Sequence, residues 1–227
     1  MFRDRADAGR RLGAMLGRYR DEHPIVVAVP RGGVPVGFEV ARALGAPLEI
    51  VVVRKLGAPG EPELGIGAVA DGDHPETVLN RDVIRLAGVP RAYLEREIER
   101  QLAEIQRRQT LYRQGREAAG LRDCTVILVD DGIATGGSIR AALRSVRRAG
   151  ARRVILAVPV APPDTIEALR AEADEIVCVL TPEYLGAIGE FYLDFSQTGD
   201  AEVIRLLQEA RAVGAATDRV ETPHGGV

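Results

Sequence analysis

Residues 126–138, with the sequence VILVDDGIATGGS, limit what this chain can fold into more than any other segment does. The segment opens with four apolar residues, three of them β-branched, as expected for a strand that is buried on both faces of a parallel sheet. The strand stops at two carboxylates, Asp130 and Asp131, and a glycine-rich turn leads into an amphipathic helix over 138–149. This order predicts an α/β unit with a ligand beyond the carboxyl end of the strand.

The turn has the chemistry of a phosphate site. Gly132, Gly136 and Gly137 allow the backbone to turn tightly and approach a ligand, while Thr135 and Ser138 add hydroxyl groups where the helix begins. A helix start presents unpaired N–H groups and a partial positive charge, which attract phosphate. Because two acids repel a phosphate, we assign them to the hydroxyls of a sugar attached to it. A ribose 5-phosphate is therefore expected; the alternative is an ordinary strand, turn and helix with no ligand.

The whole segment resembles the binding signature for 5-phosphoribosyl-1-pyrophosphate (PRPP) in type I phosphoribosyltransferases. The resemblance implies an α/β fold in which an open parallel sheet is flanked by helices, with a flap, a helical insertion and a small C-terminal hood. It also implies catalytic roles for Asp130 and Asp131. The PRPP-binding residues that it implies in this segment are Gly132, Ile133, Ala134, Thr135, Gly136, Gly137 and Ser138.

Residues 30–33, Pro-Arg-Gly-Gly, follow an apolar run at 25–29 and resemble the loop that holds pyrophosphate in the same family. Backbone N–H groups of such a turn form an anion-binding nest, and Arg31 could clamp two phosphate oxygens. The other interpretation of Gly32 and Gly33 is a simple lead into the next helix.

Lys55 is the single lysine among 30 lysine and arginine residues, and it follows a second apolar run at 48–53. A lysine kept where arginine is used elsewhere suggests a need for a compact point charge, although one lysine could also survive by chance. The resemblance places a basic pyrophosphate contact at this position, so Lys55 and Arg31 join the predicted catalytic residues.

The reaction implied by the resemblance is displacement of pyrophosphate from C1 of PRPP by a ring nitrogen, through an oxocarbenium-like transition state. Mg²⁺ is the implied cofactor, and the substrate's phosphates and hydroxyls would hold it, so no metal ligand is assigned to a protein side chain. Two alternatives stay open. The same fold could sense PRPP without catalysis, or the site could bind nucleotides and sugar phosphates in general.

The acceptor is less well defined. Ala134 stands where 6-oxopurine enzymes of the family usually carry an aspartate, so hypoxanthine and guanine become less favoured and the motif is closer to the adenine type. Phe191 and Tyr192, in the sequence EFYLDF with Phe195, are candidates for stacking on a base in the hood. Their spacing fits core packing equally well.

The pattern along the chain predicts a single domain over 1–213. Elements before the signature segment are a helix over 4–20, strands over 25–29 and 48–53 with a helix between them, and a long amphipathic helix over 91–116. After it we expect strands over 153–160 and 176–180 and a helix over 163–173. We predict a flap at 56–79, which opens with a Gly/Pro-rich loop at 56–65 that holds Glu61 and Glu63 and continues with two short strands near 66–70 and 77–79. We also predict a helical insertion at 80–120, a hood at about 181–200 and a disordered tail at 214–227.

Composition excludes several classes of protein. The formal charge is −3 with charges interspersed, so we expect no nucleic-acid partner. Without an apolar run of about 20 residues or the apolar core of a signal peptide, we expect a cytoplasmic protein with no membrane contact. Cys124 and Cys178 are far apart and are expected to be reduced. The expected partners are PRPP and a small-molecule acceptor, and a homodimer is compatible with the resemblance.

Overall fold

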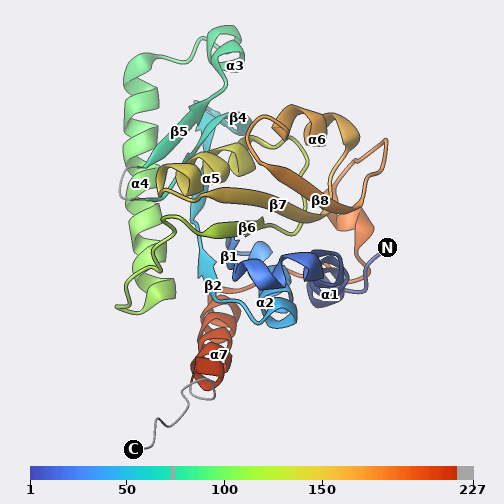
Figure 1. Cartoon of the computed structure of the whole chain (residues 1–227). Coiled ribbons are helices and arrows are strands. Elements are labelled where there is room, and N and C mark those ends of the chain that lie inside the picture. The colour runs from blue at the N-terminus through green and yellow to red at the C-terminus, as the bar shows by residue number, and fades with distance from the viewer. Residues whose placement is uncertain (73–74, 219–227) are drawn as a thin grey trace, which may run out of the picture.

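A five-stranded parallel sheet lies at the centre of the computed structural model, which describes residues 1–72 and 75–218, with side chains as far as residue 212 (Figure 1). Its strand order is β2-β1-β6-β7-β8. The bounds are β1 (Ile25–Ala28), β2 (Leu48–Ile50), β6 (Thr125–Val129), β7 (Arg153–Val160) and β8 (Glu175–Leu180). The predicted strands over 125–129 and 153–160 are confirmed, and the open parallel sheet is confirmed with them.

Helices cover both faces of this sheet, because its strands are apolar on both sides. Helices α1 (Arg5–Leu16) and α2 (Gly33–Leu44) lie on one face, and α5 (Gly137–Arg148) and α6 (Pro163–Leu169) lie on the other (Figure 1). In β6, Ile127 and Val129 pack in the core cluster that contains α1 and α2, whereas Val126 and Leu128 pack with α5. Helix α1 continues into the short 3₁₀ helix η1 (Gly17–Glu22), which together with α1 accounts for the helix predicted over 4–20.

A separate antiparallel sheet follows β2. The strands expected near 66–70 and 77–79 are present in it, but the elements before them were predicted wrongly. The strand expected over 48–53 ends at Ile50, and the segment expected as a loop over 56–65 is a hairpin of β3 (Val53–Ala58) and β4 (Glu61–Ala70). Strand β5 (Glu76–Leu79) completes this sheet. The glycines that favoured a loop are positions of close approach, since a Cβ on Gly57 would lie 2.7 Å from the carbonyl oxygen of Pro62.

The helical insertion consists of α3 (Arg81–Leu86) and the long α4 (Arg91–Arg113), which stands against the antiparallel sheet (Figure 1). Helix α4 confirms the predicted amphipathic helix, although it ends at Arg113, with Gln114 as its left-handed C-cap. Its fully buried positions are Glu97, Gln101, Ile105 and Tyr112. Two of these four are polar, which is unusual for the buried face of a helix.

The predicted hood, 181–200, is mostly irregular and contains the 3₁₀ helix η2 (Ile188–Phe191). It packs against the N-terminus through the bridge between Phe2 and Tyr192. Helix α7 (Asp200–Asp218) follows and runs past the boundary predicted at 213. The rest of the predicted tail, 219–227, lies outside the described residues. In the part of the chain described, no helix combines the length and the apolar character needed to cross a bilayer.

Candidate active site

The candidate site lies where β1 and β6 run side by side. The connection from β1 leads outward to β2, whereas β6 lies on the other side of β1, so the strand order reverses here. Crevices of this kind bind ligands in open parallel sheets. Ala28 is paired with Val129, and Val29 N–H donates to the Val129 carbonyl at 2.9 Å. This register brings the predicted loop 30–33 next to the predicted segment 130–138.

Gly32 and Gly33 are required by the contact between these two loops. A Cβ on Gly32 would lie 1.9 Å from Asp131 Oδ2, and a Cβ on Gly33 would lie 2.9 Å from the Val129 carbonyl oxygen. Any larger residue would therefore push the acid pair away from the sheet edge. The glycines are more than a lead into α2, since their small size fixes the position of Asp131.

The acid pair is partly buried and electrostatically strained. Burial, together with the charge of Asp131, raises the pKa of Asp130 well above its ordinary value. Burial also raises the pKa of Asp131, but Arg5 opposes this shift, because its Nε donates to Asp131 Oδ2 at 2.8 Å. A cationic partner would therefore favour the ionised form of these two carboxylates.

Arg5 and the hood hold Asp131 from the side opposite the glycines. Arg5 Nη1 donates to the Ser196 carbonyl at 2.7 Å, and the guanidinium lies 3.9 Å from the ring centroid of Phe195. The Tyr192 hydroxyl donates to the Asp131 carbonyl at 2.6 Å. One residue from the start of the chain and three from its hood therefore hold the backbone and the side chain of a single aspartate.

This arrangement corrects the prediction for Tyr192. Its ring is 6% exposed and packs with Phe2 and Phe195, so it forms part of a small core and is not free to stack on an acceptor. Phe191 is partly buried against the same cluster. Of the two interpretations of this sequence, core packing is correct for Tyr192.

The start of α5 is open to an anion. Gly136 adopts a left-handed φ of 76° at the N-cap and provides no side-chain cap, so the first N–H groups of the helix remain available. The predicted residues Ala134, Thr135 and Gly137 are exposed beside it, and Ser138 is partly buried. From the neighbouring helix α6, the Thr165 hydroxyl donates to the Ala134 carbonyl at 2.7 Å and supports the turn. Ile133 and Gly132 are buried beneath the turn and shape it.

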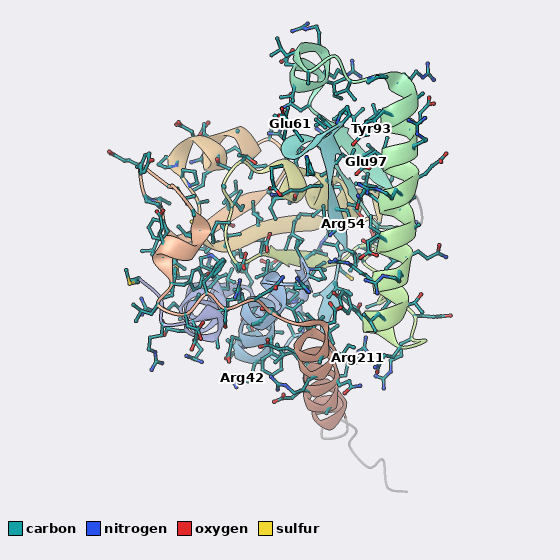
Figure 2. All side chains as sticks on the ribbon, turned by 180° about the vertical axis from the view of Figure 1, so that it is seen from behind. Arg42, Arg54, Glu61, Tyr93, Glu97 and Arg211 are labelled. Carbon is teal, nitrogen blue, oxygen red and sulfur yellow. The ribbon has the colours of Figure 1, made fainter. Side chains whose placement is uncertain are left out.

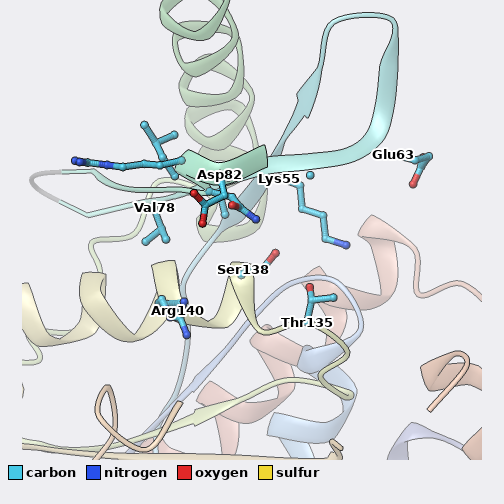
Figure 3. Close-up of a pocket in the computed structure, with 14 residues that line it drawn as sticks. Lys55, Glu63, Val78, Asp82, Thr135, Ser138 and Arg140 are labelled. Carbon is cyan, nitrogen blue, oxygen red and sulfur yellow. The ribbon is translucent and has the colours of Figure 1, made fainter. Parts of the chain in front are cut away.

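Two cavities meet at Lys55. One of about 690 Å³ lies between the antiparallel sheet and the start of α5, and Figure 3 shows Lys55 reaching into it above Thr135 and Ser138. The other, of about 520 Å³, is lined by Arg31, Gly32 and the acid pair. Lys55, Glu63 and Ser138 line both. Lys55 does not follow the second parallel strand, as expected, but lies within β3, and the fold still brings it to the site.

The sequence pattern of a phosphoribosyl transferase domain matches residues 5–196, which include both loops, Lys55 and the acid pair. The chain belongs to the phosphoribosyl transferase family. The fold described above is the type I form of that family's α/β architecture.

Relatives of this phosphoribosyl transferase family member agree with the assignment. A protein named "putative phosphoribosyl transferase" in two strains of Mycobacterium tuberculosis is 44% identical over 225 residues. That match covers 96% of this chain and 50% of the relative, so the chain spans about half the length of the curated relatives it matches. The crystal structure of TT1426 from Thermus thermophilus is 45% identical, with a TM-score of 0.77, and the match covers 92% of this chain and 98% of that one.

Sequence reasoning missed several residues at this phosphoribosyl transferase site. Arg5 carries no local signal, because it is one arginine among many and is 126 positions away from its partner Asp131. Arg54 stands next to Lys55 and lines the smaller cavity, so the pair could have been considered together. The inner face of α4 also lines this cavity, and no motif marks it. The further lining residues from α4 are Tyr93, Glu97, Arg100, Gln101 and Arg108.

Proposed function

We propose that this protein is a Mg²⁺-dependent phosphoribosyltransferase that moves the 5-phosphoribosyl group of PRPP to a nitrogen heterocycle and releases pyrophosphate. The observation that carries the proposal is the meeting of four features at one edge of the sheet. These are the loop with Arg31, the acid pair, the uncapped start of α5, and Lys55 between the two cavities. Family membership supports a PRPP-using transferase in general terms.

The arrangement suits the charges of the reaction. The start of α5 would hold the 5-phosphate through its free N–H groups and the hydroxyls of Thr135 and Ser138. Asp130 and Asp131 would accept hydrogen bonds from the ribose hydroxyls and face the positive charge that develops on the ring. Arg31 and Lys55 would face the leaving pyrophosphate, where negative charge accumulates. The sugar would then lie between the two cations, Arg31 and Lys55, and the two carboxylates, and this arrangement would stabilise the separation of charge that develops at C1.

Mg²⁺ fits this donor set as an ion held mainly by substrate. Asp130 and Asp131 are the carboxylates that would contact a substrate-bound ion, directly or through water. When bound, Mg²⁺ neutralises the phosphate oxygens of the leaving group.

We propose an acceptor closer to adenine than to hypoxanthine or guanine. Ala134 offers no side-chain carboxylate at the position before Thr135, and it is exposed beside the turn. Hydrophobic surface for a base would come from Ile188 in the hood. This side chain packs closely against Gly132, since a Cβ at Gly132 would lie 2.6 Å from Ile188 Cγ2. Partly buried Phe191 neighbours this region, whereas Tyr192 is excluded by its burial.

Isotope-labelled PRPP offered with Mg²⁺ and a panel of bases tests the proposal. We expect pyrophosphate release that requires a base, with adenine or a related amino-heterocycle preferred over 6-oxopurines. The variant Asp130→Asn/Asp131→Asn is the matched control and should release pyrophosphate far more slowly. No turnover with any acceptor would count against the catalytic proposal.

The second candidate is a PRPP sensor that binds without catalysis. The packing of Tyr192 and Phe195 into a small core favours it, because the hood then presents fewer aromatic faces to an acceptor. Calorimetric titration separates the two candidates, since Mg²⁺-dependent PRPP binding together with absent turnover would identify a sensor. Equal affinity for PRPP, ribose 5-phosphate and AMP would instead identify a general nucleotide or sugar-phosphate binder.

A further inference from the structure

The inner face of α4 carries polar side chains where a packing helix normally carries apolar ones. Glu97 and Gln101 are 5% and 6% exposed and lie one turn apart. Gln101 Nε2 donates to Glu97 Oε1 at 2.8 Å, and Arg100 Nη2 donates to the same carboxylate at 2.9 Å. Burial disfavours the charged form of Glu97, but these two hydrogen bonds outweigh it and keep its pKa below the ordinary value. A buried polar pair of this kind is costly unless it has a further partner.

That partner is Arg54 of β3. Its Nε donates to Gln101 Oε1 at 2.9 Å, which is the only hydrogen bond that the Arg54 guanidinium makes within the described residues. In that same part of the chain, no carboxylate oxygen lies within 4.0 Å of Arg54, although most neighbouring arginines have one. Figure 2 shows Arg54 beside Glu97 and Tyr93 on the inner side of α4. The amide thus orients a partly buried guanidinium that lines the cavity of about 520 Å³, and its two terminal nitrogens have no hydrogen-bond partner among the described residues.

A second arginine at this cavity is also connected to α4. Tyr112 is 1% exposed, and its hydroxyl donates to Asp200 Oδ1 at 2.6 Å. The same oxygen lies 3.8 Å from Arg31 Nη1. The Tyr112 hydroxyl is the closer partner of this oxygen, and Arg31 makes only a long contact with it, so the guanidinium of Arg31 keeps most of its donors for the cavity.

We propose that α4 belongs to the active site, with Gln101 and Tyr112 as positioning residues that aim Arg54 and Arg31 at the pyrophosphate of PRPP. This inference rests on the proposed function and assigns a role to the helical insertion. The strand β3 alternates its side chains, so Arg54 faces α4 while Lys55 faces the start of α5. Three cations then approach one anion: Arg54 and Lys55 from opposite faces of β3, and Arg31 from the loop after β1.

The electrostatics favour a ligand over a purely structural role. Burial and the neighbouring Arg108 lower the pKa of Arg54, which means that its positive charge is less favoured here than on an arginine in water. A residue that served only to attach α4 would gain more from a carboxylate than from a neutral amide. A neutral amide orients the guanidinium without cancelling its charge, which leaves that charge for an incoming anion.

The test compares Gln101→Leu and Tyr112→Phe with Gln106→Leu, which makes the same change on the exposed face of α4. Each variant is titrated by calorimetry with PRPP, Mg²⁺-pyrophosphate and ribose 5-phosphate at fixed salt, because screening alters all three affinities. We expect Gln101→Leu to weaken PRPP and pyrophosphate binding about tenfold, equivalent to about 1.4 kcal/mol, while ribose 5-phosphate affinity is unchanged. Tyr112→Phe should show a smaller loss with the same selectivity, and Gln106→Leu should match the wild type.

The selectivity between ligands decides the outcome. Equal losses for pyrophosphate and ribose 5-phosphate, or no loss in a folded Gln101→Leu variant, would overturn the positioning role. If Gln101→Leu does not fold, Gln101→Asn and Tyr112→Phe must show the same selective loss, and the inference falls if they do not. If wild-type protein binds pyrophosphate but not PRPP, the proposed function fails while the comparison on pyrophosphate still decides the role of α4.

Discussion

Arg5 shows how much of this site depends on single side chains from distant parts of the chain. Its guanidinium contacts the carboxylate of Asp131, the carbonyl of Ser196 and the ring of Phe195, and its side chain is 12% exposed. The contact opposes the effect of burial on Asp131, so that Asp131 is the easier of the two acids to ionise. Asp130 has no such partner within 4.0 Å among the described residues, and its pKa is raised further by the charge next to it.

Replacing Arg5 should therefore change the pH dependence of the site. Because the Arg5 charge lowers the pKa of Asp131, Arg5→Gln should raise that pKa and move the acid limb of the PRPP turnover profile to higher pH. We expect several-fold greater loss of kcat/KM near about pH 6 than near about pH 8. Arg3→Gln, an exposed arginine just before the same helix, is the control. A uniform loss across the pH range would indicate damage to the fold instead.

Lys55 can be tested through its position between the two cavities. Lys55→Ala should weaken PRPP binding on the order of tenfold and ribose 5-phosphate binding much less, because only PRPP carries the pyrophosphate. Lys55→Arg should restore part of the affinity, since a planar fork cannot occupy the position of a compact ammonium. Paired calorimetric titrations at fixed Mg²⁺ and salt measure both. Equal losses for the two ligands would exclude a selective contact with pyrophosphate.

Among the elements, the β3–β4 hairpin is the one placed to cover the site. Its outer part, residues 61–65, is exposed, while Ile66 and Val69 anchor its base in the core. Glu63 from the exposed part lines both cavities, whereas Glu61 faces an apolar pocket at the hairpin tip. In the proposed reaction, a rigid base with an exposed end suits a cover that closes over substrate and keeps water away from the ribosyl cation.

Hydrogen exchange should reveal this closure. In the free protein we expect fast exchange of the amides at 61–65 and slow exchange at 66–70, since only the base is buried. Saturating PRPP with Mg²⁺ should slow exchange at 61–65 on the order of tenfold, whereas ribose 5-phosphate should have a smaller effect. The 3₁₀ helix η1, which lines neither cavity, supplies the internal comparison. Unchanged protection at 61–65 with bound PRPP would contradict a covering role.

At the scale of the whole molecule, the acid pair exchanges stability for function. The pKa of Asp130 is raised by burial and by Asp131, so the folded protein binds more protons than the unfolded chain once the pH exceeds the unfolded value of about 3.9. The free energy of unfolding must then fall as the pH rises from that value through the raised pKa. A protein selected for stability alone would not place two carboxylates together there.

Removing the charge of Asp130 should thus stabilise the protein. Asp130→Asn keeps the oxygen that accepts from the Asp131 N–H and removes the buried charge. We expect a higher melting temperature than wild type at neutral pH, with the difference vanishing below about pH 4, where both states are protonated. Thermal melts across the pH range measure this, with exposed Asp21→Asn as the control. A melting temperature below that of wild type at neutral pH would refute the assigned strain.

The same substitutions should abolish activity. Asp130→Asn combined with Asp131→Asn is expected to reduce turnover by about 10²–10³-fold, the range known for loss of a single electrostatic donor at a transition state. Pyrophosphate release from PRPP is the measurement, with circular dichroism to establish that the double variant is folded. Near-full turnover in a folded variant would remove the acids from the mechanism.

The sequence alone determined the central sheet and the position of the glycine-rich turn before α5. Strands such as β6 and β7 are continuous apolar runs bounded by breaking residues, and the order strand, acids, glycines, helix is local chemistry that needs no distant partner. It also singled out Arg31, Gly32, Gly33 and Lys55, because glycines and an isolated lysine are visible in one dimension. Local signals thus predicted which loops meet at the edge of the sheet.

Only the tertiary structure decided what surrounds those loops. Residues 56–65 were predicted as a loop, since glycine and proline there indicate turns. Most of them are strand in the structure, because β3 pairs with β4. Tyr192 could have faced an acceptor or the core, and packing against Phe2, 190 positions earlier, settled it. Arg5, Arg54 and Gln101 reached the site through contacts between elements far apart in sequence. Such contacts depend on how helices and sheets pack in three dimensions, and local composition carries no record of them.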